Sequence, residues 1–372
     1  MGKARIVEKI RIESGGIRKV VTNLLQEGYI NLITITGVDQ GDNIKLLYHF
    51  SNPKGDIKHI ETLISKNSLS IPTISDIILG SYIYEMEVHD LLGVDFVYNP
   101  WAEFKLLLPE CYPPDFPPPL WKEADPKVIR EKLFAVEGPG CTILEPVSPM
   151  SALSPESVIV PFGPYHPALK EPEYFRLIVE GETIVAAVPR IGFIHRGIEK
   201  ATEYRTFLKD IFLLERVCGI CSLHHSWTFV MAVEELLGLE VPERAEYIRT
   251  LIAELERIHS HSLWLGLVGY WMGFETMFMW VWNVREEIMD LFEILCGNRV
   301  HKSIVTIGGV RRDISDEKLK IVLEKLQKFE KHFKSVMEDV LSYDEFIERT
   351  SGIGTYSLET ARKLCTVGAI RR

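Results

Sequence analysis

The sequence predicts an α+β domain followed by a mainly α-helical bundle domain with a small β edge. Apolar and polar residues alternate at 29–36 and 45–50, which is the pattern of half-buried strands. Beyond residue 242, apolar residues recur at helical spacing over long runs. A chain of 372 residues is long enough for two or three domains with substantial cores. We place the predicted domains at 1–125 and 157–372, with a linker at 126–156.

Strand and turn signals predict the elements of the first domain. Asp39–Asn43 is rich in turn-forming residues and joins the two alternating stretches as a hairpin. Pro109–Pro126 favours an extended polyproline conformation and a semi-rigid connector. We interpret the isolated His49, His59 and His89 as satisfied surface or core residues. The predicted elements are a helix at 17–25, strands at 29–36 and 45–50, a helix at 59–66 and a further strand before Glu85.

The second domain begins with strands and becomes helical beyond Gly192. Pro242 begins a long amphipathic helix, Gly297 ends a second, and Ser315 caps a third. The predicted elements are strands at 158–160, 174–180 and 183–188 and helices from 243 to about 265, at 281–295 and from 315 to about 340.

One apolar stretch, Leu265–Val284, has the length of a membrane span. Gly266, Gly269 and Gly273 weaken it as a single helix, and amphipathic helices flank it on both sides. We therefore interpret it as a pair of buried helices, in a chain that lies on a membrane without crossing it.

Charge and cysteine usage exclude several classes of protein. The net charge of -10 and the lack of a basic run argue against general nucleic-acid binding. Six cysteines, four of them scattered, do not form a disulfide framework, so a reducing cytosol is predicted. We interpret the scattered cysteines as packing residues: Cys111, Cys141, Cys296 and Cys365. The charged segment Met1–Glu13 is neither a signal nor a transit peptide.

The chemistry of the chain is predicted to centre on Cys218 and Cys221, which have Cys-x-x-Cys spacing. Ser222 is predicted to cap a helix that starts directly after the pair, and a helix start favours thiolates. Soft sulfur ligands suit iron, nickel, copper(I) or zinc. The spacing alone leaves four interpretations open, namely a redox metal centre, half of a structural zinc site, a reactive dithiol and two buried thiols.

Four sequence blocks resemble the large subunit of nickel–iron hydrogenases, in the membrane-bound, energy-converting group related to respiratory complex I. The blocks are PFGPYHP at 161–167, GFIHRGIEK at 192–200, ERVCGIC at 215–221 and IGGVRRD at 307–313. The complex I relatives are expected to lack both cysteines, so Cys218 and Cys221 favour the hydrogenase group.

This resemblance implies roles for individual residues. Cys218 would bind nickel terminally and Cys221 would bridge nickel and iron. His225 matches a histidine that forms a hydrogen bond with a cysteine sulfur and tunes it. Glu171 matches a carboxylate that relays protons from the metal site.

Other block residues receive weaker interpretations. His166 is interpreted as a structural or proton-path residue. Arg311 and Arg312 are expected to face a partner subunit near its iron–sulfur cluster. Glu199 and Arg216 have no assignable chemical step.

The first domain resembles the 30-kilodalton-type subunit of complex I. EMEVHDLLGVDF at 85–96, followed by LLLP at 106–109, carries this resemblance. In formate-hydrogenlyase-type enzymes such a module is fused ahead of the large subunit, and its implied role is docking onto neighbouring subunits.

The sequence departs from the family in one respect that affects the metal site. The family completes its metal cage with a second Cys-x-x-Cys pair, and this sequence contains only one such pair. We therefore expect the chain to be part of a large subunit and to be inactive alone, with the remaining C-terminal part supplied by another polypeptide. The alternative is an interrupted, inactive product.

The expected partners are that remaining part, an iron–sulfur small subunit that carries the clusters, and membrane-arm subunits. The expected location is cytoplasmic, peripherally attached to the cytoplasmic membrane. Two functional alternatives remain open: a nickel-free relative that reduces quinone or sulfur compounds, and a non-catalytic assembly protein.

Overall fold

The computed structural model describes residues 6–101, 105–109, 112–113, 115–135 and 154–366. The chain divides into two compact units, the first formed by Met1–Arg196 with Thr355–Arg372 and the second by Gly197–Gly354. The strands are β1 Ile6–Ile12, β2 Asn31–Asp39, β3 Asn43–Ser51, β4 Ile57–Ser65, β5 Ser70–Pro72, β6 Asp95–Val97, β7 Val158–Phe162, β8 Tyr174–Glu180, β9 Thr183–Arg190, β10 Val305–Thr306 and β11 Gly309–Val310. The helices are α1 Ile17–Gln26, α2 Ser81–Leu92, α3 Pro126–Ala135, α4 Ile198–Thr202, α5 Phe207–Glu215, α6 Ser222–Leu237, α7 Glu243–Trp271, α8 Glu275–Cys296, α9 Asp316–Leu341, α10 Asp344–Thr350 and α11 Leu358–Lys363.

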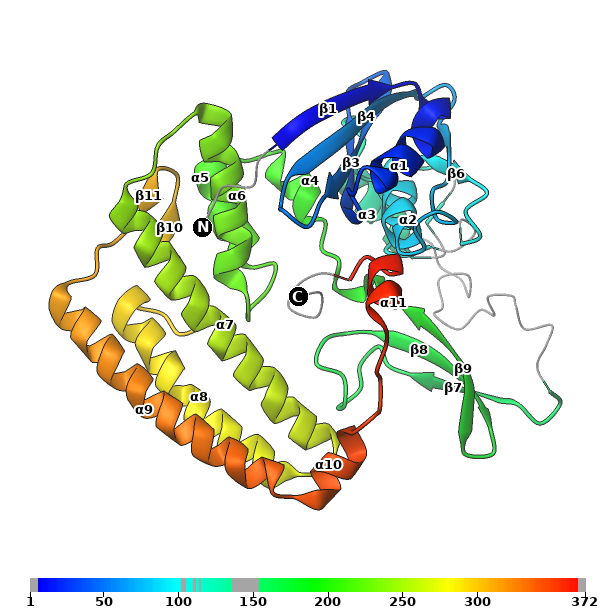
Figure 1. Ribbon diagram of the computed structural model, residues 1–372. Coiled ribbons are helices and arrows are strands. Elements are labelled where there is room, and N and C mark those ends of the chain that lie inside the picture. The colour runs from blue at the N-terminus through cyan, green and yellow to red at the C-terminus, as the bar shows by residue number, and fades with distance from the viewer. Residues whose placement is uncertain (1–5, 102–104, 110–111, 114, 136–153, 367–372) are drawn as a thin grey trace. The chain divides into compact units, whose positions relative to one another are not determined.

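The first unit contains a four-stranded sheet in the order β1-β4-β3-β2. β1 runs parallel to β4, while the other neighbours are antiparallel. Helices α1 and α2 pack their apolar residues against one face of this sheet (Figure 1). The predicted β2–β3 hairpin is confirmed, since the Gln40 amide donates a hydrogen bond of 2.8 Å to the carbonyl of Asn43.

The helix predicted at 59–66 is wrong, because residues 59–65 belong to strand β4. Ile60, Thr62 and Ile64 alternate with more exposed residues, and β-branched side chains at this spacing fit a strand that is buried on one face. Because His59 lies on β4, it pairs with His49 on the neighbouring strand β3. Their Nδ1 atoms are 2.7 Å apart, so the two histidines are not isolated.

The proline-rich segment is also not the extended connector predicted for Pro109–Pro126. Its described part forms turns, as in the 3.0 Å hydrogen bond from the Trp121 amide to the carbonyl of Pro118. The indole of Trp121 donates a hydrogen bond of 2.8 Å to the carbonyl of Leu92. The segment therefore packs onto the four-stranded sheet with its helices α1 and α2, the sheet-and-helix module of the first unit. Of the predicted linker, 126–135 is helix α3, while 136–153 lie outside the described residues, as do Cys111 and Cys141.

The first unit also contains the helix α11 and the three strands predicted at the start of the second domain, which form the antiparallel sheet β7-β8-β9. After α11, Cys365 is buried in the core of the sheet-and-helix module, in agreement with its predicted packing role. The Gly80 amide donates a hydrogen bond of 2.7 Å to the carbonyl of Lys363. Residues far apart in sequence thus meet at the start of α2.

The second unit is the predicted helical bundle. The long helices α7, α8 and α9 lie side by side, and α5 packs against α6 (Figure 1). The stretch that resembles a membrane span is a helix pair, because α7 ends at Trp271 and α8 begins at Glu275. None of the described helices combines the length and apolarity needed to cross a bilayer.

Two predicted helix ends in this unit, at Gly297 and Ser315, are confirmed by backbone and side-chain geometry. Gly297 ends α8 in the left-handed region, at a φ of 76°. The hydroxyl of Ser315 accepts a hydrogen bond of 3.4 Å from the Lys318 amide at the start of α9. Cys296 is buried in the bundle core, which agrees with a packing role.

Candidate metal centre

The two cysteines of the Cys-x-x-Cys motif lie in the short connection between α5 and α6, and both are half-buried. Cys221 directly precedes α6 as its N-cap residue, which confirms the prediction that the second cysteine lies at a helix start. The backbone amides of Ile220 and Cys221 each donate a hydrogen bond of 3.3 Å to the Cys218 sulfur. Amide donors directed at a sulfur atom stabilise the negative charge that a metal-bound thiolate carries.

His225 lies one turn further along α6 and joins the two cysteines. Its Nε2 atom is 3.5 Å from the Cys221 sulfur. The two sulfurs and a ring nitrogen of His225 all lie within 4.8 Å of one another, the one cluster of three or more such ligand groups found in the described part of the chain. Two thiolates and an imidazole can bind nickel, iron or zinc, and each of these metals would need further ligands here.

Burial opposes the thiolate at Cys221. Desolvation, together with the neighbouring Cys218 sulfur, raises the pKa of the Cys221 thiol to about 12. At Cys221, desolvation therefore outweighs the stabilisation of the thiolate expected from the helix start. A metal ion that binds here must displace the thiol proton.

Ser222 does not cap α6, contrary to prediction, because it is the first helical residue. The amides at the start of α6 instead donate to a carboxylate from α7, that of Glu256. The Leu223 amide lies 3.0 Å from Glu256 Oε1, and the His224 amide lies 3.2 Å from Oε2. Sequence reasoning missed Glu256, since no local signal links it to a helix start more than thirty residues away.

The Glu256 carboxylate is fully buried and ionised. Its partners include His224 Nδ1 at 2.6 Å and the buried Lys302 ammonium at 2.9 Å. Burial alone would raise the pKa of Glu256, but the hydrogen bond from His224 and the charge of Lys302 lower it to about 2. The start of α6, which carries the candidate metal ligands Cys221 and His225, is therefore hydrogen-bonded to one member of the buried Glu256–Lys302 ion pair.

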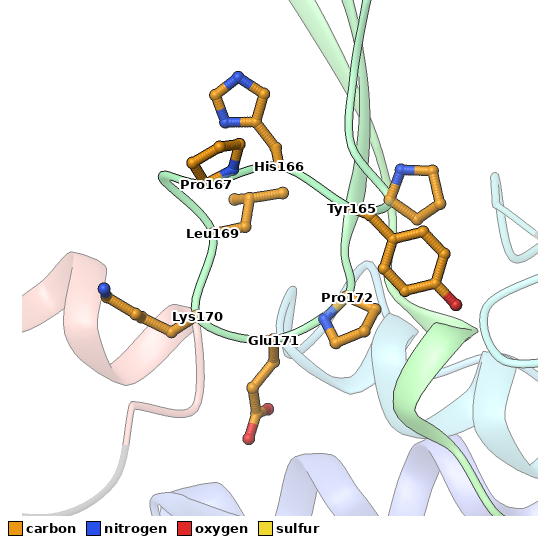
Figure 2. Close-up of a pocket in the computed structure, with 8 residues that line it drawn as sticks. Tyr165, His166, Pro167, Leu169, Lys170, Glu171 and Pro172 are labelled. Atoms are coloured by element: carbon orange, nitrogen blue, oxygen red, sulfur yellow. The ribbon is translucent and has the colours of Figure 1, made fainter.

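Glu171 and His166 lie on the loop between β7 and β8 in the first unit, where the loop borders a hollow of about 410 Å³. Figure 2 shows their side chains pointing to different sides of this loop. Glu171 is exposed. His166 accepts a hydrogen bond of 3.1 Å from the Ala168 amide through Nδ1, and its ring packs on Phe162. The proton-relay role of Glu171 stays a prediction.

The two arginines of the 307–313 block contact their own unit. The Arg312 guanidinium donates a hydrogen bond of 2.8 Å to the carbonyl of Cys296 at the end of α8. The Arg311 guanidinium lies over the ring of Phe212, 5.1 Å from its centre. Their predicted place beside a partner's iron–sulfur cluster stays a prediction.

Comparison with protein families assigns three consecutive regions of the chain. Residues 10–127 match the 30-kilodalton subunit of respiratory-chain NADH dehydrogenase. Residues 196–266, which hold the cysteine pair, match nickel-dependent hydrogenases. Residues 272–372 match the 49-kilodalton subunit of respiratory-chain NADH dehydrogenase.

Individual proteins also match the chain over different shares of its length. The chain is 44% identical to the membrane-bound hydrogenase subunit alpha of Pyrococcus furiosus over 58% of this chain and 50% of that protein. It is 35% identical to hydrogenase-4 component G of Escherichia coli over 82% of this chain and 54% of that protein. Among solved structures, a chain of the archaeal membrane-bound sulfane sulfur reductase matches with a TM-score of 0.52 and 34% identity, over 55% of each chain.

The chain spans about half the length of these relatives. Its regions follow the fused order predicted from the sequence, with the 30-kilodalton-type domain ahead of the hydrogenase region. In its matched regions the chain is therefore similar to the nickel–iron hydrogenase large subunits, related to complex I, that carry a fused 30-kilodalton-type domain.

Proposed function

We propose that this chain is part of the large subunit of a membrane-bound nickel–iron hydrogenase that interconverts protons and H2. The observation that carries this proposal is the cluster of Cys218, Cys221 and His225 at the start of α6. It lies within the region that matches nickel-dependent hydrogenases. A half-buried pair of sulfurs with directed amide donors suits a metal that is bound permanently.

The residues of the cluster would divide the work of holding the metals. The sulfurs of Cys218 and Cys221 would hold the nickel–iron group, and His225 would orient the Cys221 sulfur. The bound nickel–iron group would supply the heterolytic chemistry of H2. The sequence contains no second Cys-x-x-Cys pair, so we assign the remaining thiolates to another segment of the assembled large subunit.

Glu171 would accept the proton released at the metal site and pass it outwards. A carboxylate suits this step because it can both accept and donate a proton. The exposed position of Glu171 leaves its carboxylate accessible to neighbouring parts of the assembled enzyme.

The proposed partners follow from the relatives, which are named as a membrane-bound hydrogenase subunit and a respiratory membrane complex. An iron–sulfur subunit would carry electrons, and membrane-arm subunits would attach the chain peripherally to the cytoplasmic side of the membrane. The 30-kilodalton-type domain, with proposed bounds 1–125, would serve as a docking module for the hydrogenase region proposed at 157–372.

The proposal is tested by hydrogen uptake of the assembled complex, measured with a dye as electron acceptor. Cys218→Ser and Cys221→Ser should each abolish uptake, because a hydroxyl is a poor ligand for nickel. Cys296→Ala removes a buried thiol that lies outside the cluster and should retain uptake. Wild-type activity in either serine variant would contradict the proposal.

A second candidate function is the reduction of sulfur compounds without nickel. The match to the sulfane sulfur reductase chain favours it, at 34% identity. The same complex should then reduce polysulfide and show no hydrogen uptake.

A further inference from the structure

The start of α6, which carries Cys221 and His225, is fixed by a residue from outside that helix. Four amides at a helix start have no partner within the helix, and Cys221 provides no side-chain cap. The Glu256 carboxylate takes this role, with Oε1 accepting from the Leu223 amide at 3.0 Å and Oε2 from the His224 amide at 3.2 Å. Helix α7 thereby fixes the first turn of α6, next to Cys221 and His225.

The position of this carboxylate is itself fixed by Lys302. The Lys302 ammonium is buried, lies 2.9 Å from Glu256 Oε1 and donates a hydrogen bond of 2.9 Å to the carbonyl of Val300. The Ser222 hydroxyl lies 3.3 Å from Glu256 Oε1 and 3.1 Å from the same carbonyl. Removing either charge of such a buried pair would leave the other without compensation.

The other end of the cysteine loop is tied to the same segment after α8. Glu215, the last residue of α5, is fully buried. Its carboxylate accepts hydrogen bonds from the Ser303 amide and from the Ser303 hydroxyl, the latter at 2.6 Å. Residues 300–303 therefore connect both ends of the loop that carries Cys218 and Cys221.

We propose that Glu256, held by Lys302, is a positioning residue that sets the geometry, and hence the metal affinity, of the Cys218, Cys221 and His225 cluster. This inference rests on the proposed metal-binding role of the cysteines. Glu256 acts through the backbone of α6, and its contacts are made in the metal-free protein. Outer partners of this kind commonly contribute tenfold to hundredfold to metal affinity.

Cobalt(II) titration of the purified chain tests the proposal, since thiolate ligands give cobalt a charge-transfer absorption. In Glu256→Gln an NH2 group, which donates hydrogen bonds, replaces one of the two carboxylate oxygens that accept from the amides of α6. Glu256→Asp keeps the charge beside Lys302 but draws the carboxylate back by one methylene. Both variants should weaken cobalt affinity by about tenfold or more, with changed absorption. If Glu256→Gln does not fold, the cobalt affinity of the milder Glu256→Asp variant tests the proposal.

Two matched controls separate positioning from general destabilisation. Glu254→Gln makes the same chemical change at an exposed position of α7, where Glu254 pairs with Arg257. Val233→Ala removes buried apolar surface further along α6. Both controls should bind cobalt like the wild type. Wild-type affinity in Glu256→Asp, or an equal loss in Val233→Ala, would overturn the inference.

A second readout works without metal. Hydrogen exchange at the Leu223 amide should be slow in the wild type and fast in Glu256→Asp, because this amide loses its buried acceptor. The His224 amide also donates to the carbonyl of Cys221 at 3.1 Å, so its exchange should change less. Unchanged exchange would overturn the positioning role. If the wild-type chain gives no cobalt–thiolate absorption, the metal role of the cysteines fails, and amide exchange still decides whether Glu256 fixes α6.

Discussion

At the scale of single residues, the helical unit buries two ionisable side chains, Glu256 and His259, whose surroundings favour one protonation state. Glu256 is kept charged by Lys302 and His224, whereas burial beside the Arg285 guanidinium keeps His259 neutral. Arg285 lies 3.3 Å from Nε2 of His259, and the histidine ring packs on Phe292. Such groups connect the stability of the bundle to pH.

His259 is expected to make the helical unit less stable in mild acid. Desolvation and the charge of Arg285 lower its pKa to about 3, so the folded chain resists a proton that the unfolded chain takes up below pH 6.5. Stability is therefore fully present above about pH 6.5 and falls as the pH drops towards 3. His259→Gln should reduce the loss of thermal stability between pH 7 and pH 5. The exposed His261→Gln serves as control, and equal losses in both variants would contradict the assignment.

The sequence was sufficient to find Cys218 and Cys221, because Cys-x-x-Cys spacing reflects a local geometry, and the family resemblance pointed to His225. The sequence was insufficient for Glu256 and Lys302, which reach the start of α6 only through the packing of α7 and the segment after α8. The predicted Ser222 cap failed for the same reason. A local rule assigned to the serine a role that a distant carboxylate performs.

At the scale of elements, helix ends with their own capping residues were predictable, as Ser315 and Gly297 show. Strand β4 was not, since its neighbours β1 and β3 determine that Ile60, Thr62 and Ile64 face a core. The proline-rich segment was misjudged because turns and the contact of Trp121 with α2 outweigh the polyproline preference.

The contact between Gly80 and the segment after α11 gives a prediction at this scale. A Cβ atom at Gly80 would lie 2.5 Å from the carbonyl carbon of Leu364 and 2.9 Å from the Cys365 sulfur. Gly80→Ala should therefore release α11 and make buried Cys365 reactive towards iodoacetamide, as measured by peptide mass spectrometry. Gly15→Ala is the control, because a Cβ there meets nothing within 4 Å. Continued protection of Cys365 in Gly80→Ala would refute this docking.

At the scale of the whole molecule, the fused order of a 30-kilodalton-type domain and a hydrogenase region was predictable from sequence blocks. The compact units divide the chain at other residues than the proposed domains, because β7–β9 and α11 group with the first unit. Contacts such as the 2.7 Å hydrogen bond from the Arg190 guanidinium to the carbonyl of Leu108 explain this grouping. No sequence pattern predicts such contacts.

The metal content of the assembled complex tests the central claim most directly. Elemental analysis by mass spectrometry should find nickel in an amount equal to this chain, and Cys218→Ser should remove it while leaving the complex assembled. A complex that performs its native reaction and contains no nickel would contradict the account.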